Sequence, residues 1–407
     1  MNADASPHVV FVPYWGAANP YQDALAEHLS ACGVEVEKVR TLKNLFRCGI
    51  FLRGTPDIVH LHWLLVFGWR QFRAFRCLVF VLRLIVLRLR GIPLVWTIHN
   101  LLPHESRHPK MDWLLTRIVA GLSSGLIVHG QSAQRQAVET WGLKDESRFT
   151  VIPHGNYTGN YPNEVTRTAA RAKLGLDDSE VVLLFLGAVR PYKGVLELIE
   201  AFRTLAADHT SLVIAGRPLN DEFARKIETA AAGLDSVRFH PGFVQDDDVQ
   251  VYMNAADVVV LPYRHILSSG AALLAMSFAK PCIAPAIGCL ADVLDASGAF
   301  LYDPECEGGL LESMRHAVEA RDALGRMGAH NRDRVSQWTW AKAAEATRAV
   351  YEQCLPSAGS ACGDLGRVQG ESDQREPGPV PGAGDGGLPQ CPVATETQHQ
   401  AGDAERI

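Results

Sequence analysis

Paired cysteines and zinc-type clusters are absent from this sequence. Its nine cysteines are odd in number and scattered, with no C-x-x-C pair and no grouping of histidine and cysteine at zinc-ligand spacing. This absence argues against a disulfide framework and a zinc module, and we expect free thiols in a reducing compartment. No basic segment followed by an apolar core stands near the first residue, so no signal peptide is expected. The net charge of −6 argues against a nucleic-acid binder that works by bulk positive charge.

The chain does have ample material for a core: 47% of its 407 residues are hydrophobic and 21% are charged, as in soluble globular proteins. Short apolar runs alternate with helical stretches, which is typical of parallel α/β sheets. In the first half the predicted strands are His8–Pro13, Val34–Val39, Ile58–His62, Leu94–His99, Gly125–His129 and Phe149–Ile152. In the second half they are Val181–Leu186, Ser211–Ala215, Val237–His240, Val258–Leu261, Pro281–Ala284 and Ala299–Tyr302.

This alternation predicts the α/β class with two doubly wound, Rossmann-like domains. Glycine, asparagine, proline and tyrosine cluster over 155–168, so we place an N-terminal domain at 1–160 and a C-terminal domain at 161–356. Residues 357–407 contain ten glycines and no aromatic residue, which predicts a disordered tail that is dispensable for catalysis. Ligands of such folds bind where the strands end at their carboxyl termini.

The most informative segment is Leu186-Gly-Ala-Val-Arg-Pro-Tyr-Lys-Gly194, which lies between an apolar strand and a helical pattern. Backbone N–H groups and the positive end of a helix attract an anion there. Arg190 can fork onto phosphate oxygens and Lys193 supplies a compact charge, so the segment predicts a diphosphate site. The spacing fits neither the Walker loop nor the dinucleotide fingerprint. An ordinary turn with two solvated cations is the alternative.

This segment resembles the donor-phosphate loop of family-4-type GT-B glycosyltransferases, in which G-x-x-x-x-x-K-G opens the C-terminal domain. Residues 257–281 resemble the strand, loop and helix that hold the nucleotide-sugar donor in the same family. The resemblance implies a GT-B architecture, two domains facing a cleft, and a donor site that includes Gly187, Arg190, Lys193, Ser268, Ser269 and Gly270. The family usually carries two glutamates eight positions apart here, whereas this chain has Ile266 and Leu274. The usual ribose contact therefore cannot be carried over.

Three polar residues stand at or just after the end of the predicted strand Leu94–His99. In the resembling family a histidine at the position of His99 contacts the donor sugar. His99, His104 or Glu105 could instead act as general base on an acceptor hydroxyl, because burial moves either type of pKa toward neutrality. We name all three as candidate catalytic residues. A loop with helix-capping polar groups is the alternative.

Other strand ends carry glycine and histidine. The resemblance places Gly16, in the first loop, on the interdomain cleft with the donor-binding residues. His60 and His62 alternate on one strand and are interpreted as core or cleft-edge histidines rather than metal ligands, because no acidic partners stand at ligand spacing. The pairs His129-Gly130 and His154-Gly155 also match family patterns.

Residues 69–90 contain six arginines and no acid. On a helix these arginines fall within an arc of roughly 160°. Cations interleaved with large apolar groups suit the surface of an anionic bilayer, and we predict membrane contact at Arg73, Arg76, Phe80 and Arg83. The longest uncharged run has six residues, far short of the roughly 20 that span a membrane. A helix packed on the sheet with a basic exterior is the alternative, and both can hold.

Together these features predict a glycosyltransferase that moves a hexose from a UDP- or GDP-sugar to a lipid-linked glycan or other glycan acceptor. No D-x-D motif stands at a strand end apart from the run at 246–248, so neither a metal nor a cofactor beyond the nucleotide sugar is expected. We expect a cytoplasmic protein at the inner face of the membrane. Two other functions stay open: a GT-B nucleotide-sugar epimerase, and a degenerate, non-catalytic sugar-binding scaffold.

Overall fold

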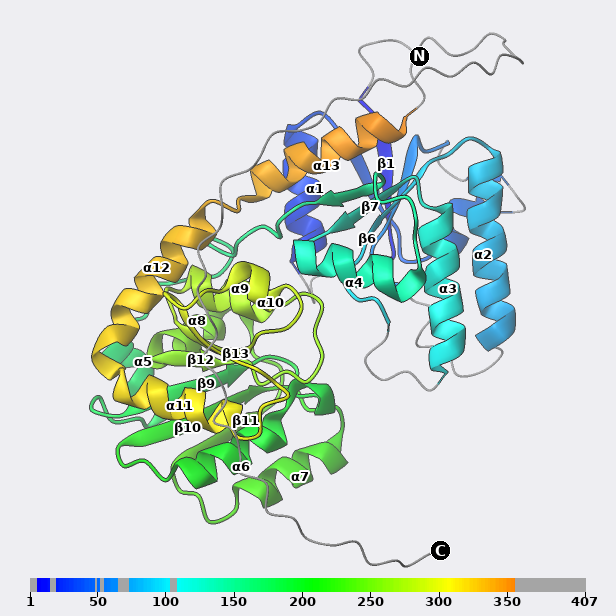
Figure 1. Cartoon of the computed structure of the whole chain (residues 1–407). Helices are drawn as coiled ribbons and strands as arrows, with labels where there is room; N and C mark the ends of the chain where they lie inside the picture. The colour runs from blue at the N-terminus through cyan, green and yellow to red at the C-terminus, as the bar shows by residue number, and fades with distance from the viewer. Residues whose placement is uncertain are drawn as a thin grey trace, which may run out of the picture. The chain divides into compact units, whose positions relative to one another are not determined.

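The computed structural model describes residues 6–14, 20–47, 50–51, 55–64, 73–102 and 108–355, and these include two six-stranded parallel sheets (Figure 1). The first sheet has the order β2-β1-β5-β6-β7-β8. Its strands are β1 (His8–Val12), β2 (Glu35–Lys38), β5 (Ile58–Leu61), β6 (Leu94–Thr97), β7 (Gly125–Val128) and β8 (Phe149–Val151). A short antiparallel pair, β3 (Phe46–Arg47) and β4 (Ile50–Phe51), follows the 3-10 turn η2 (Leu42–Leu45).

Helices cover both faces of the first sheet, because its strands are apolar on both sides. Val10 and Val12 of β1 pack into one core, whereas Val9 and Phe11 pack into the other. The first core lies under α2 (Arg73–Leu89), α3 (Pro109–Leu122) and α4 (Gln131–Trp141). The second core lies under α1 (Tyr21–Ala31) and α13 (Trp340–Cys354), the last helix described.

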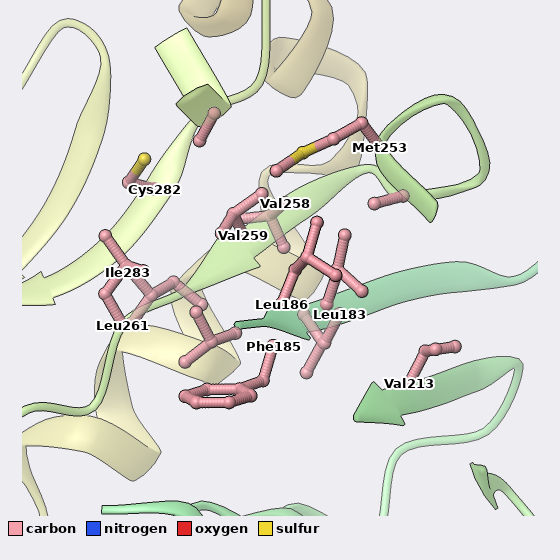
Figure 2. Close-up of a cluster of buried hydrophobic side chains, with 14 of the residues drawn as sticks. Leu183, Phe185, Leu186, Val213, Met253, Val258, Val259, Leu261, Cys282 and Ile283 are labelled. Carbon is pink, nitrogen blue, oxygen red and sulfur yellow. The ribbon is translucent and has the colours of Figure 1, made fainter. Parts of the chain in front are cut away.

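The second sheet has the order β11-β10-β9-β12-β13-β14. Its strands are β9 (Val181–Leu186), β10 (Thr210–Gly216), β11 (Val237–Pro241), β12 (Val258–Val260), β13 (Cys282–Pro285) and β14 (Ala299–Tyr302). Its helices are α5 (Arg167–Leu174), α6 (Val195–Leu205), α7 (Asp221–Ala231), α8 (Asp246–Ala255), α9 (Gly270–Ser277), α10 (Leu290–Val293), α11 (Gly309–Glu319) and α12 (Leu324–Ser336), with 3-10 turns η4 (Pro191–Lys193) and η5 (Arg321–Ala323). Figure 2 shows Leu183, Phe185, Val259 and Ile283 meeting in its apolar core.

Helix α13 belongs to the packing of the first sheet although it follows the second in sequence. Figure 1 shows it beside α1, and Trp340, Ala344 and Tyr351 are buried in the same core as the α1 residues. Thr339 begins the helix, because its side chain accepts a hydrogen bond from the backbone N–H of Lys342.

The prediction of two doubly wound parallel sheets is confirmed. Every predicted strand is present, and its observed ends lie within two residues of the predicted ones. The predicted domain boundaries stay a prediction, and the proposed tail at 357–407 lies outside the described residues. Over the ranges that the structure describes, none of the helices has both the length and the apolar character needed to span a membrane.

Candidate active site

The loop that follows β9 is shaped by glycines that allow close backbone contact. Gly194 has φ +70°, and a Cβ there would stand 1.9 Å from the carbonyl oxygen of Pro262. Gly216, with φ +148°, would place a Cβ 1.8 Å from the carbonyl oxygen of Gly187. Only glycine fits either position, so the ends of β9, β10 and β12 come together around this loop.

Two cations lie in this loop without a carboxylate partner among the described residues. Arg190 donates two hydrogen bonds of 3.1 Å, to the carbonyl oxygens of Val189 and Arg217. Lys193 is half-buried, and its ammonium lies 5.5 Å from the centre of the Tyr263 ring. Burial, and then the charge of Arg190, lowers the pKa of Lys193 to about 8. Cations without a carboxylate partner at a helix start attract an anion, so this loop stays the candidate phosphate site.

Ser268, Ser269 and Gly270, three of the predicted donor-site residues, stand at the start of α9. The Ser269 hydroxyl accepts a hydrogen bond of 3.2 Å from the N–H of Ala272 and so caps the helix. The Ser268 hydroxyl donates to the carbonyl oxygen of His99 at 3.3 Å. A Cβ on Gly270 would stand 3.0 Å from the Tyr157 hydroxyl oxygen. The start of α9 therefore lies against residues that follow the first sheet.

Five histidines gather where neighbouring strands of the first sheet end. They are His60, His62, His99, His129 and His154, and Tyr21 of α1 lies among them. The ring centres of His60 and His62 lie 4.3 Å apart, and His62 Nδ1 lies 3.4 Å from His99 Nε2. His129 lies 5.3 Å from both the His99 and the His154 ring centres. We call these five side chains the histidine array.

Burial keeps the histidine array uncharged. It lowers the pKa of His60 and of His154 to about 3 and that of His129 to about 4. The pKa values of His62 and His99 are also well below the usual range, first because of burial and then because of the neighbouring imidazoles. At neutral pH these rings therefore offer both a donor and an acceptor nitrogen.

The individual histidines differ in how well they are bonded. His60 is satisfied at both nitrogens, by the Tyr351 hydroxyl at 2.6 Å and the Thr97 hydroxyl at 2.7 Å, so the prediction of a satisfied core histidine is confirmed for it. The Nε2 atoms of His62 and His129 are buried and have no hydrogen-bond partner among the described residues. Within those residues no group of histidine, cysteine and acidic side chains has the arrangement of a metal site.

Several predicted site residues are brought together, and others cannot be placed. The carbonyl oxygen of His99 accepts a hydrogen bond from Ser268, whereas Gly187, Arg190 and Lys193 all lie within the loop after β9. Gly16, His104 and Glu105 lie outside the described residues, so their roles stay predictions. Sequence reasoning did not assign His129, His154 or Trp340 to the site. The two His-Gly pairs after predicted strands were the only signal pointing to the two histidines, and no signal pointed to Trp340.

Helix α2 is apolar on two opposite sides. Cys77, Leu84 and Leu87 are buried in the core under it, and half-buried Phe80 packs against the same core. On the outer side lie Phe75, Leu78, Leu82, Val86 and Leu89, whose exposed fractions run from 38% to 82%. We call these five side chains the α2 stripe.

Arginines stand beside the α2 stripe. Arg76, Arg88 and Arg90 are exposed and Arg83 is half-buried. Arg73 begins the helix, but its side chain lies outside what the structure describes. The helix carries no acidic residue.

Two six-stranded parallel sheets covered by helices are the features of the GT-B fold, and the structural neighbours agree. Sucrose-phosphate synthase from Thermosynechococcus elongatus matches with a TM-score of 0.68 at 19% identity, over 86% of this chain and 98% of that one. HepE of Anabaena in complex with UDP matches with a TM-score of 0.66 at 17% identity, over 85% of this chain and 100% of that one. At these identities the likeness shows the fold.

Sequence comparison identifies the family. The model "Glycosyltransferase Family 4" matches residues 9–156, and "Glycosyl transferases group 1" matches 180–320. A GDP-mannose:glycolipid 4-beta-D-mannosyltransferase of Xanthomonas campestris is 30% identical over 271 residues, covering 65% of this chain and 72% of the relative. A D-inositol 3-phosphate glycosyltransferase of Geodermatophilus obscurus is 29% identical over 282 residues, covering 64% of this chain and 61% of the relative. The chain belongs to the family 4, or group 1, glycosyltransferases, and it is a sugar-transferring enzyme.

Proposed function

We propose that the enzyme transfers a hexose from a UDP- or GDP-sugar to a lipid-linked glycan. The observation that carries the donor assignment is the pair Arg190 and Lys193, two cations that have no carboxylate partner in the described part of the chain and lie where β9 ends and α6 begins. The named activity of the Xanthomonas relative, which uses GDP-mannose and a glycolipid, supports both halves of the proposal. Family membership favours transfer over the epimerase and scaffold hypotheses.

The chemistry follows from the leaving group. As the bond between the anomeric carbon and the diphosphate breaks, negative charge grows on the phosphate oxygens. Arg190 and Lys193 are placed to neutralise that charge, and preorganised electrostatic stabilisation is usually the largest catalytic contribution. The start of α9, at Ser269 and Gly270, adds backbone N–H groups and a positive helix end. We therefore propose a reaction in which the protein's own cations take the part that a metal plays elsewhere.

The nucleotide is held differently from the usual family pattern in this proposal. Ile266 and Leu274 stand at the positions of the family's two glutamates, and both are half-buried against the core of the second sheet. Neither side chain can accept a hydrogen bond from a ribose or a sugar hydroxyl. Donor affinity is then expected to depend more strongly on the diphosphate than on the ribose.

Calorimetric titration of UDP and GDP, followed by a transfer assay with UDP- and GDP-sugars and a membrane lipid extract, tests this function. Lys193→Met removes the cation at the site. Lys280→Met is a matched control, because burial also lowers the pKa of Lys280 to about 8. Lys280 lies just before β13, and its ammonium donates a hydrogen bond to the carbonyl oxygen of Ala256. We expect Lys193→Met to weaken nucleotide binding by about 10- to 100-fold, as for a lost charged hydrogen bond, and Lys280→Met to bind normally. Wild-type protein that binds neither nucleotide would overturn the proposal.

We also propose that the α2 stripe docks the enzyme on an anionic membrane. The stripe offers contiguous apolar side chains, of which Leu89 is 82% exposed and Phe75 66% exposed, and exposed apolar patches of this kind mark interaction sites. Arg76 and Arg83 lie on the same helix, which carries no acidic residue, and Arg90 directly follows it. An apolar stripe beside arginines, on a helix that carries no acid of its own, matches a lipid surface with anionic headgroups.

Charge distinguishes a membrane from a second copy of the chain. Two copies packed stripe to stripe would bring their arginines together in a buried contact with no acid on either helix, and such like-charge juxtaposition is costly. Lipid headgroups supply the missing negative charge. The proposed lipid contact therefore falls on the α2 stripe and its flanking arginines, while Phe80 supports the helix from its inner side.

Sedimentation with vesicles tests this contact. Wild-type protein should bind vesicles of phosphatidylglycerol and phosphatidylcholine but not vesicles of phosphatidylcholine alone. The double substitution Phe75→Ser and Leu82→Ser should abolish binding. Phe243→Ser with Leu219→Ser is the matched control, because both side chains are exposed and lie outside α2. Equal binding by both double variants, or a wild-type dimer that Phe75→Ser and Leu82→Ser dissociates, would overturn the membrane assignment.

A further inference from the structure

His129 follows β7 and has a fixed tautomer. Its Nδ1 lies 2.9 Å from the carbonyl oxygen of Ile152. A carbonyl oxygen can only accept, so Nδ1 carries the proton and donates it. In the neutral ring Nε2 is then a bare lone pair, available to accept a hydrogen bond or a proton.

This lone pair lacks a donor among the described residues. His129 Nε2 is buried and unpartnered there, and so is the indole N–H of Trp340. His129 and Trp340 each contact both the Tyr21 and the His154 rings, at 5.2 to 5.5 Å between ring centres. A buried acceptor and a buried donor around the same two rings are the complement of a hydroxyl group, which both donates and accepts.

The same cluster adjoins the proposed donor site. Ser268, at the start of α9, donates to the carbonyl oxygen of His99, whose ring is a neighbour of His129. His154 Nε2 lies 3.5 Å from the Tyr157 hydroxyl, which in turn stands against Gly270. The histidine array thus reaches the helix start that we assign to the diphosphate.

The carboxylate close to this cluster is already engaged. Asp292 lies beside Gly130, where a Cβ would stand 2.2 Å from its Oδ2, but its two oxygens accept hydrogen bonds from Ser132. The positions of the two family glutamates are apolar, at Ile266 and Leu274. Within the described ranges, the unoccupied base at this cluster is therefore an imidazole nitrogen.

Resting on the proposed transfer function, we propose that His129 Nε2 binds the acceptor hydroxyl and removes its proton. The hydroxyl oxygen forms a bond to the anomeric carbon of the donor sugar while the bond from that carbon to the diphosphate breaks. The electron pair of the broken bond leaves on the diphosphate, and the proton passes to His129 and then to solvent. A displacement assisted by a base on the acceptor side inverts the configuration of the anomeric carbon.

The groups that face His129 fit this role. His99, His154 and Tyr21 are all uncharged at neutral pH because burial disfavours their charged forms. None of them therefore places a fixed charge beside His129 that would oppose its protonation. A bound diphosphate adds negative charge nearby, which favours the imidazolium form of His129. Donor binding would thereby strengthen the base when it is needed.

Two substitutions of His129 test whether it acts as a base or only supports the local structure. His129→Asn keeps an N–H for the carbonyl oxygen of Ile152 and deletes Nε2, whereas His129→Gln keeps an oxygen that can accept a hydrogen bond but not a proton. His28→Asn is the matched control, because His28 Nδ1 also lies 2.9 Å from a carbonyl oxygen, that of Ala24, and His28 does not belong to the array. Transfer from the donor identified in the UDP- and GDP-sugar screen to the membrane lipid extract is followed for all three variants.

We expect kcat to fall by about 100-fold or more in both His129 variants, and the acidic limb of the pH profile of kcat to disappear. KM for the acceptor lipid should rise only in His129→Asn, and His28→Asn should match wild type. Nuclear magnetic resonance of the product should show an anomeric configuration opposite to that of the donor. Nucleotide binding measured by calorimetry confirms that each variant is folded.

The outcomes distinguish this proposal from the one it rests on. Transfer with retention of configuration, or an unchanged acidic limb in His129→Asn, overturns the role of His129 while leaving the enzyme's function intact. A thermal-stability loss with unchanged kcat would show that the lone pair only binds an internal water, and it overturns the role equally. No transfer and no nucleotide binding by wild-type protein overturns the proposed function itself.

Discussion

The Asp292 carboxylate accepts two hydrogen bonds from Ser132, one from its backbone N–H at 2.9 Å and one from its hydroxyl at 2.8 Å. Asp292 lies in α10, beside the second sheet, and Ser132 lies in the first turn of α4, beside the first sheet. The N-terminus of α4 is thus satisfied by a side chain from 160 residues further along the chain. The two halves of the enzyme meet at a helix cap.

We predict that this cap couples the stability of the two halves. In a double-mutant cycle, Asp292→Ala and Ser132→Ala should show a coupling energy of about 1 kcal/mol, the typical net contribution of a hydrogen bond. Chemical unfolding of the four proteins measures it. Strictly additive effects would show that the contact contributes nothing in solution. Asp145→Ala with Ser147→Ala, a cycle on an exposed local pair, provides the comparison.

Gly194→Ala should destroy donor binding. The alanine Cβ would collide with the carbonyl oxygen of Pro262, so the loop that carries Lys193 has to move. Gly233→Ala is the control, because Gly233 also has a positive φ, +77°, but nothing lies within 4 Å of a Cβ there. Gly233→Ala should cost only the strain of that backbone conformation, about 1 to 2 kcal/mol, with normal nucleotide binding. Calorimetry and urea unfolding of both variants check this, and equal effects would refute it.

The free energy of unfolding should fall as the pH drops below 6.5. The histidines of the array have pKa values lowered by burial, to about 4 for His129 and about 3 for His60 and His154. Between those values and 6.5 the unfolded chain binds more protons, so their contribution is complete above pH 6.5 and is lost toward pH 4 to 3. His129 alone should contribute about 2 kcal/mol of the loss between pH 6.5 and 5. Urea unfolding at pH 7 and 5 measures this, and His129→Asn should reduce the difference.

Donor affinity should decline above pH 8. The pKa of Lys193 in the free enzyme is about 8, so more alkaline solutions remove the charge that attracts the diphosphate. Nucleotide titrations from pH 7 to 9.5 should show the decline in wild type but not in Lys193→Arg, because arginine stays charged throughout. Affinity that is independent of pH in wild type would contradict the assignment of Lys193 to the phosphate site.

The strands were predictable because their signal is local. The run Val181–Leu186 is apolar at every position and is observed as β9 with the same ends. The loop after it was predictable for the same reason, since its glycines and cations follow the strand directly. No local sequence pattern, however, indicated which side of α2 would face the core. Leu84 is buried while Leu82 is 50% exposed, because the packing of α2 on α3 and the sheet selects one of two apolar sides.

The histidine array required the topology. His60, His99, His129 and His154 are each unremarkable beside their own strands, and they meet only because β5, β6, β7 and β8 are consecutive neighbours in one parallel sheet. Trp340 reaches the array from a helix that begins almost 200 residues after the last of these strands ends, as the sequence numbering shows. Periodicity gives no information about which sheet such a helix will cover.

The return of α13 to the first sheet has a consequence for how the chain acquires its structure. A ribosome completes all six strands of the first sheet, then the whole second sheet, before it produces Tyr351, whose hydroxyl lies against His60. Throughout that interval α13 has not been synthesised, so the part of the first sheet that it packs against lacks this helix. The packing of the first sheet therefore cannot be completed before the second sheet has been synthesised, and a nascent chain holds an unfinished apolar surface until α13 emerges.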